Sequence, residues 1–216
     1  MMMVQPESLA EQAYEVVERM IVTLELPPGH VFSEGDLSEQ VGIGRTPLRE
    51  ALQRLSGDRL VAAVPRRGIV VTDINASEYL SLLQTRGVLD RLIAEQAARR
   101  ASPEERNELQ RLAPLLLESA RSKNSDGFMK YDKAVDRILE NASRNPYANQ
   151  AVSPLHAHSR RFWSVYQHHG SLIESATFHV EIMEAVAAGN SEAAGYASDQ
   201  LIDYLTSFTR KALDLD

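Results

Sequence analysis

The sequence predicts a mainly α protein in which an N-terminal winged helix-turn-helix is followed by an all-α antiparallel helical bundle. Three short helical segments and then two β-prone runs around a Pro-Arg-Arg-Gly turn occupy residues 8–71. From Ala76 onward the apolar spacing is helical to the end, and no strand signal interrupts it. We therefore expect two domains, residues 1–74 and 75–216.

The first helix is expected over residues 8–25, where apolar side chains recur at helical spacing and Ser8 is a plausible N-cap. The LPPG segment that follows stops this helix, because proline cannot continue it and glycine permits a turn. Ser33 with Asp36 resembles a shortened capping box, and it predicts a second, short helix that ends at Gly42.

The third helix is expected to begin at Thr46 as the N-cap, with Pro47 in its first position, and to run to about residue 56. Its inward face carries Leu48, Ala51, Leu52 and Leu55. The apolar period then changes, and residues 60–64 and 69–71 read as the two strands of a hairpin. Three helices followed by this hairpin make a winged helix-turn-helix.

The second domain reads as long amphipathic helices that are interrupted by Ser-Pro, Asn-Pro, Gly and Asn-Ser-Asp-Gly signals. The predicted helices cover residues 76–101, 103–122, 126–143, 147–168, 171–188 and 191–213. Short connections favour an antiparallel bundle, and the core of such a bundle can shelter a ligand.

Composition narrows the classes of function. The 216 residues include no cysteine, which excludes disulfides and thiolate metal sites, and no apolar stretch is long enough to span a membrane. We expect a cytoplasmic protein. The net charge of −7 disfavours a non-specific nucleic-acid binder, yet residues 45–67 hold six arginines against two acids. Contact with a polyanion is therefore expected within this window only.

The expected DNA contacts follow from the geometry of the helix-turn-helix, whose second helix enters the major groove with its N-terminal residues against bases and phosphates. Arginines four residues apart share one helix face and can form paired hydrogen bonds with guanine. Arginines and a glycine at the tip of the hairpin add a second contact. The predicted contact residues are Arg45, Thr46, Arg49, Arg66, Arg67 and Gly68.

The segments GRTPLREALQRLSGDRLV and PRRGIVV resemble the DNA-binding half of the GntR family of bacterial transcription regulators. SEYLSLLQTRGVLDRLIAEQAARRA resembles the start of the FadR-type ligand-sensing domain, called FCD. The resemblance implies a homodimer that binds a palindromic operator and changes its DNA affinity when a small metabolite, usually a carboxylate, enters the bundle. Two positions depart from the family pattern: Gly35 replaces an arginine that often contacts DNA, and Gly44 replaces a polar residue.

The resemblance also implies a divalent metal held by one aspartate and three histidines in many FCD domains. Asp132 and His179 match two of these positions, Asp136 stands where a histidine is usual, and Leu201 falls on the last position. An incomplete site of Asp132, Asp136 and His179 would prefer a harder ion or hold zinc loosely. The alternative is a polar, hydrogen-bonded pocket without metal.

The expected effector-binding residues combine these polar groups with buried arginines. Arg86 resembles an arginine that many family members direct into the cavity, where it would pair with a carboxylate. The full set is Arg86, Asp132, Asp136, His179 and Arg160, with Arg161 as a further candidate. Four histidines are expected on the surface near a helix end, because their spacings do not converge: His156, His158, His168 and His169.

The expected function is therefore a ligand-responsive, DNA-binding transcriptional regulator, and no catalytic residue is assigned. Two other classes were weighed: a metal-dependent enzyme built in the bundle with Asp132 as a base, and a protein-protein adaptor. The enzyme would need a nucleophile or a full metal set, and neither pattern is present in the sequence.

Overall fold

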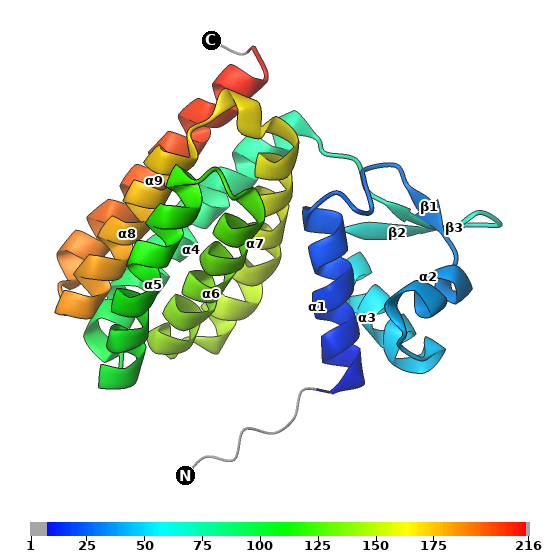
Figure 1. The fold of residues 1–216 in the computed structure, drawn as a ribbon, viewed down its shortest axis with the longest axis horizontal. Coiled ribbons are helices and arrows are strands. Elements are labelled where there is room, and N and C mark those ends of the chain that lie inside the picture. Colours follow the sequence, from blue (N-terminus) through cyan, green and yellow to red (C-terminus); the bar gives the residue numbers. More distant parts are fainter. Residues whose placement is uncertain (1–7, 215–216) are drawn as a thin grey trace. The chain divides into compact units, whose positions relative to one another are not determined.

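The computed structural model describes residues 8–214, apart from the side chains of residues 76 and 77, and it confirms the mainly α class (Figure 1). The described chain divides into two compact units. The first contains residues 8–74 together with 157–165, and the second contains residues 75–156 and 166–214. Among the described residues, no helix is long and apolar enough to cross a membrane.

The first unit is a winged helix-turn-helix, as the sequence predicts. Its elements are α1 (Leu9–Val22), β1 (Val31–Phe32), α2 (Glu34–Val41), α3 (Arg45–Gly57), β2 (Val61–Val64) and β3 (Gly68–Val71). Helix α3 packs against α1 and α2, and the fully buried side chains of Val17, Ile21, Leu48 and Leu55 form the centre of this core. Burial of these apolar side chains fixes which face of α3 points inward.

The wing has three strands where two were predicted. The antiparallel sheet has the order β1-β3-β2, with Val31 opposite Val70 and Val61 opposite Val71. Strand β1 escaped prediction because two residues are too few to show a period of two. The sheet therefore ties the wing to the segment that leads into α2.

The predicted helix ends agree with the structure to within a few residues. Ser8 and Ser33 cap α1 and α2 through their hydroxyl oxygens, and Gly42 ends α2 in the left-handed conformation. Helix α1 stops at Val22, earlier than predicted, and Leu24 adopts a positive φ of 64°. These caps and stops are local chemistry, so the sequence alone reveals them.

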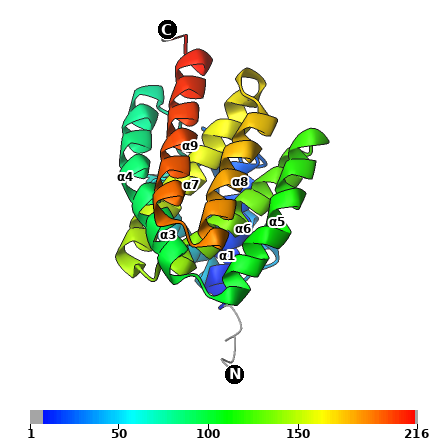
Figure 2. The ribbon, with the colours of Figure 1, turned by 90° about the vertical axis from the view of Figure 1, so that its left-hand side faces the viewer.

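The second unit is a helical bundle. Its helices are α4 (Ala76–Arg100), α5 (Pro103–Arg121), α6 (Ser125–Ser143), α7 (Pro146–Tyr166, with residues 157–165 counted in the first unit), α8 (Leu172–Ala188) and α9 (Ser191–Ala212), with a short 3-10 helix, η1 (Gln167–His169). Helices α4, α9, α8 and α5 lie side by side, and α6 packs on α4 and α5 (Figure 2). Short connections between consecutive helices, such as residues 122–124 and 189–190, make neighbours antiparallel.

Arg106 joins three helices of this unit. Its guanidinium donates to four carbonyl oxygens at the C-terminal ends of α4 and α8: those of Ala98, Ala101, Val186 and Ala187, at 2.7–3.0 Å. The last carbonyls of a helix have no partner within the helix, and a cation there also matches the helix dipole. Arg106, which belongs to α5, therefore holds the C-terminal ends of α4 and α8 together.

Candidate functional site

Helix α3 presents a basic face outward and an apolar face inward. Arg45 and Arg49 are exposed one turn apart, whereas Leu48 and Leu52 are buried in the core. The structure thus brings the two predicted arginines onto one accessible face. An exposed pair of guanidinium groups on a helix suits phosphates and guanine edges.

The first turn of α3 lacks a side-chain cap, which corrects the prediction for Thr46. The helix begins at Arg45 with Gly44 as N-cap, and within the described part of the chain this end has no side-chain cap hydrogen bond. Thr46 is exposed and lies inside the helix rather than at its cap. Uncapped N–H groups together with the positive end of the helix dipole favour an anion at this position.

Arg45 and Arg49 of α3 both lie against the start of α2. Arg49 donates to the carboxylate of Glu34 from Nε at 3.0 Å and from Nη2 at 2.8 Å. A Cβ atom on Gly35 would lie 3.4 Å from Nη2 of Arg45, so this guanidinium rests against the glycine. The residue that departs from the family pattern therefore leaves room for Arg45.

The wing carries the second pair of predicted arginines. Arg66 and Arg67 are exposed in the turn between β2 and β3, and Arg66 adopts a positive φ of 63°. Gly68 has a φ of +106°, and its missing Cβ would lie 2.6 Å from the carbonyl oxygen of Phe32. Packing against β1 therefore requires this glycine, whether or not the backbone also approaches DNA.

Arg54, also on α3, belongs to another face. It donates to Glu11 at 2.5 Å, and its guanidinium lies over the ring of Tyr14 at 4.2 Å from the ring centre. These partners lie on α1. The arginines of residues 45–67 therefore do not all face outward: Arg54 packs against α1.

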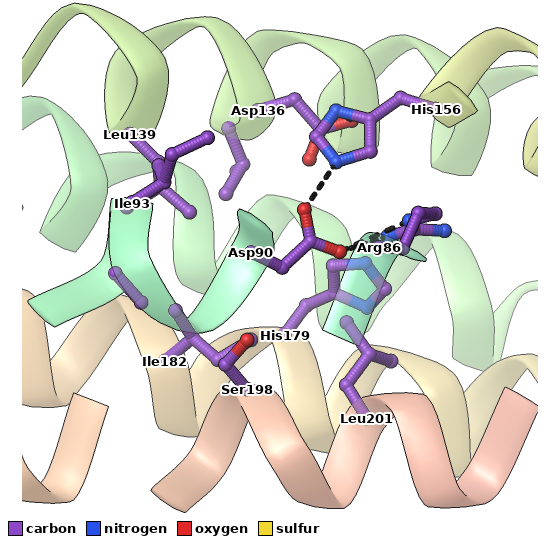
Figure 3. A pocket seen from close by; sticks show the side chains of 12 residues that line it. Arg86, Asp90, Ile93, Asp136, Leu139, His156, His179, Ile182, Ser198 and Leu201 are labelled. Atoms are coloured by element: carbon purple, nitrogen blue, oxygen red, sulfur yellow. Dashed lines mark hydrogen bonds and ion pairs between the residues drawn. The ribbon is translucent and has the colours of Figure 1, made fainter. Parts of the chain in front are cut away.

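A cavity of about 30 Å³ lies in the second unit, lined by α4, α6, α7, α8 and α9 (Figure 3). Asp90 of α4 stands at its centre between two cations: it accepts from Arg86 Nε at 3.0 Å and contacts His156 Nε2 at 2.8 Å. Asp136 and His179 also line the cavity, and Leu201 supplies an apolar wall. The volume leaves room for one or two water molecules.

His156 is surrounded by carboxylates. Its Nδ1 lies 3.2 Å from Asp136 and 3.3 Å from Glu140, while Nε2 faces Asp90. Burial opposes the charged imidazole, but Asp136 and Asp90 outweigh burial and raise the pKa of His156 to about 9. Burial likewise opposes the charge of Asp90, yet Arg86 and His156 lower the pKa of this carboxyl to about 2. His156, Asp90 and Arg86 are therefore all charged at neutral pH.

The residues of the candidate metal site form two separate pairs. His179 Nε2 lies 2.9 Å from Asp132, and its Nδ1 faces the carbonyl of Ser175 at 2.7 Å, whereas Asp136 lies beside His156. Within the part of the chain that the structure describes, no three His, Cys, Asp or Glu side chains form a group that could hold a metal ion. Asp132, Asp136 and His179 thus each make polar contacts with neighbouring side chains or backbone, and whether they hold a metal stays a prediction.

Arg160 belongs to the first unit, where it pairs with Glu18 of α1 at 3.6 Å, and both side chains are buried. The next residue, Arg161, is also buried there and donates to Thr72. Effector binding by Arg160 stays a prediction.

The surface prediction for His156 is wrong. Its side chain is only 6% exposed, because position 156 falls in a buried stripe of α7 with Val152, Ser159 and Trp163. That helical spacing was the signal available in the sequence. His158 is half-buried, with Nε2 2.8 Å from the carbonyl of Asp58.

Asp90 was not predicted as a site residue at all. In the sequence, Asp90 stands out only because it follows Arg86 by four residues. Such spacing is common for ion pairs on helices and does not by itself indicate a functional site. His168 and His169 are exposed, as predicted.

The fold and this outward basic face define a winged-helix protein that carries a helical bundle with a charged cavity. Comparison with known families agrees. The family model of the bacterial regulatory proteins, gntR family, matches residues 9–71, and that of the FCD domain matches residues 81–204. The chain belongs to the GntR family of bacterial regulatory proteins, in the FadR-type group with an FCD domain.

Curated relatives are also regulators. The chain is 30% identical over 86 residues to an HTH-type transcriptional regulator of Agrobacterium vitis, covering 40% of this chain and 50% of that protein. It is 36% identical over 87 residues to one of Streptomyces ambofaciens, covering 38% and 37%. The chain thus spans half or less of the length of these two relatives. The HTH-type transcriptional repressor RspR of Escherichia coli is 23% identical over 202 residues, covering 93% and 89%.

Solved structures share the fold. McbR/YncC of Escherichia coli superposes with a TM-score of 0.82 at 17% identity, covering 98% of this chain and 100% of that one. A GntR transcriptional regulator from Rhodococcus sp. RHA1 gives a TM-score of 0.69 at 23% identity, covering 97% and 100%. At these identities the likeness concerns the fold alone.

Proposed function

We propose that this regulator binds a palindromic operator as a homodimer and that a small carboxylate metabolite changes its affinity for DNA. In this proposal, residues 1–74 read the operator and residues 75–216 sense the ligand and dimerise. The observation that carries the proposal is that Arg45 and Arg49 lie on one exposed face of α3, beside an N-terminus whose N-cap residue makes no side-chain hydrogen bond. Arg66 and Arg67 on the wing support the same role.

The contacts would divide by chemistry. The N-terminus of α3, with Thr46, would hold a phosphate, while Arg45 and Arg49 would pair with guanine edges in the major groove. Arg66 and Arg67 would contact phosphates or the minor groove, with Gly68 allowing a close approach. Phosphate contacts would set the register, and base contacts would supply specificity.

A homodimer follows from the symmetry of operators. A two-fold protein addresses the two halves of a palindrome with identical helices. In vitro selection from a randomised duplex pool tests both points: the proposal requires an enriched inverted repeat, and sedimentation of the complex requires two chains per duplex. Enrichment of a single half-site bound by one chain would refute the palindromic dimer.

For the effector, Arg86 is the candidate anchor. It is buried, lines the cavity and can offer two parallel donors to a carboxylate. Asp90 already accepts from Arg86, so an incoming carboxylate would have to displace Asp90 or share Arg86 with it. A cavity of about 30 Å³ is far below the volume of drug-sized sites, so binding would also have to widen it.

A thermal-shift screen of small organic acids tests this assignment, because a ligand of the folded state raises its stability. A hit should stabilise the wild-type protein and fail to stabilise Arg86→Gln. By linkage, a hit that changes operator affinity must have its own affinity changed by operator DNA by the same factor. A hit that shifts both proteins equally would place the effector elsewhere.

A further inference from the structure

Glu34 is an acidic residue in the middle of a face that is otherwise suited to DNA. It is the first residue of α2, and its carboxylate accepts two short hydrogen bonds from Arg49, at 3.0 and 2.8 Å. The hydrogen bond from Arg49 is the largest influence and lowers the pKa of Glu34; burial opposes it, and the charges of Arg49 and Arg45 add to the lowering. Glu34 is therefore ionised at neutral pH beside both arginines.

The contact leaves part of Arg49 available. Glu34 takes the edge formed by Nε and Nη2, and no hydrogen bond or ion pair of Nη1 is recorded for this residue within the described chain. A guanidinium held by one edge keeps its plane fixed and still presents donors at its end. Guanine offers two acceptors, O6 and N7, to such a planar group.

Stability of the fold does not explain this pair. The side chains of Arg49 and Glu34 are 59% and 32% exposed, and exposed ion pairs contribute little to folding. The start of α2 is already capped by Ser33. If α3 contacts DNA as proposed, this carboxylate would repel nearby phosphates, so its presence needs an explanation other than stability of the fold.

We propose that Glu34 is a specificity-determining residue. Its carboxylate offsets the charge of Arg45 and Arg49 and orients Arg49, so that random DNA binds weakly and only an operator that engages the free end of Arg49 binds tightly. The inference rests on the proposed DNA contacts of α3. It concerns the ratio of operator affinity to random-DNA affinity rather than DNA binding itself.

The test compares the full-length wild-type protein with Glu34→Gln and Glu39→Gln. Both variants lose one carboxylate from α2, but Glu39 is exposed and has no recorded hydrogen bond or ion pair to either arginine among the described contacts. Fluorescence anisotropy at several salt concentrations measures binding to a random-sequence duplex and to the duplex that the wild-type protein enriches by in vitro selection.

Glu34→Gln is expected to bind the random duplex about 5- to 10-fold more tightly at low salt and to steepen the salt slope by about 1, because one more phosphate is neutralised. Affinity for the selected duplex should change by less than about 3-fold, so the specificity ratio falls. Glu39→Gln should keep the wild-type ratio.

Two outcomes would overturn the inference. An unchanged ratio in Glu34→Gln, which includes an equal loss of affinity for both duplexes, or an equal fall of the ratio in Glu39→Gln would show that Glu34 has no special role. If the wild-type protein enriches no sequence at all, the proposed operator recognition fails first, and that result is distinct from the other two.

Discussion

The carbonyl oxygen of Phe32 lies 2.6 Å from the point that a Cβ atom on Gly68 would occupy. This contact joins β1 to the first residue of β3, and it occurs where Gly68 adopts a φ of +106°. Both the space and the backbone conformation exclude a side chain. The wing that carries Arg66 and Arg67 is therefore held by packing against the segment that leads into α2.

Gly68→Ala should destabilise the protein by roughly 1–3 kcal/mol, because a methyl group would meet a backbone oxygen and the left-handed backbone would be strained. Urea denaturation followed by circular dichroism measures the loss. Gly57→Ala is the control: nothing lies within 4 Å of its added Cβ, so its stability should stay within about 1 kcal/mol of wild type. Equal stability of both variants would refute this packing account.

Arg106→Met should destabilise the protein by roughly 2–4 kcal/mol, because four carbonyl oxygens at the ends of α4 and α8 lose their donor. Arg111→Met on the same helix removes an exposed ion pair with Glu108 and should leave the melting temperature close to that of the wild-type protein. Thermal unfolding distinguishes the two variants. Similar melting temperatures for both would contradict the role of Arg106.

Stability should decrease as pH rises from about 6.5 towards 9, since the carboxylates around His156 raise its pKa from 6.5 to about 9. A group whose pKa is raised by folding stabilises the folded state fully at a pH below its unfolded-state pKa. This stabilisation is lost as the pH rises through the folded-state pKa. The groups that face the ring are Asp90, Asp136 and Glu140, with Arg86 opposing them.

His156→Gln should flatten this pH dependence by roughly 1–3 kcal/mol over that interval and should lower stability at neutral pH. The control is His168→Gln, since His168 is exposed and should leave the wild-type profile unchanged. The free energy of unfolding is measured by urea titration at each pH. A His156→Gln profile that parallels wild type would show that His156 is not held protonated.

The sequence predicts the helices well because their signals are local. Serine caps, glycine stops and proline breaks each act within a few residues, as Ser8, Ser33 and Gly42 show. Strand β1 depends on pairing with β3, more than thirty residues away, so two residues of local sequence could not reveal it. The outward position of Arg45 and Arg49 could be predicted because helical spacing separates them from the buried leucines.

The charged cavity was harder to predict because its members come from several helices. Asp90 and His156 meet across α4 and α7, and no motif in the sequence links the two residues. Spacing on a single helix led to the wrong surface prediction for His156. The apolar period along a single helix does not reveal contacts that depend on how several helices pack together.

Operator binding by Arg49→Ala tests the central claim most directly. Arg54→Ala is the matched control, since it removes the same charge from the same helix but from the face that packs against Tyr14. With the duplex enriched by the wild-type protein, Arg49→Ala should lose about 10- to 100-fold in affinity with unchanged helix content, and Arg54→Ala less than about 3-fold. Wild-type affinity in Arg49→Ala, or an equal loss in both variants, would contradict DNA recognition by this face.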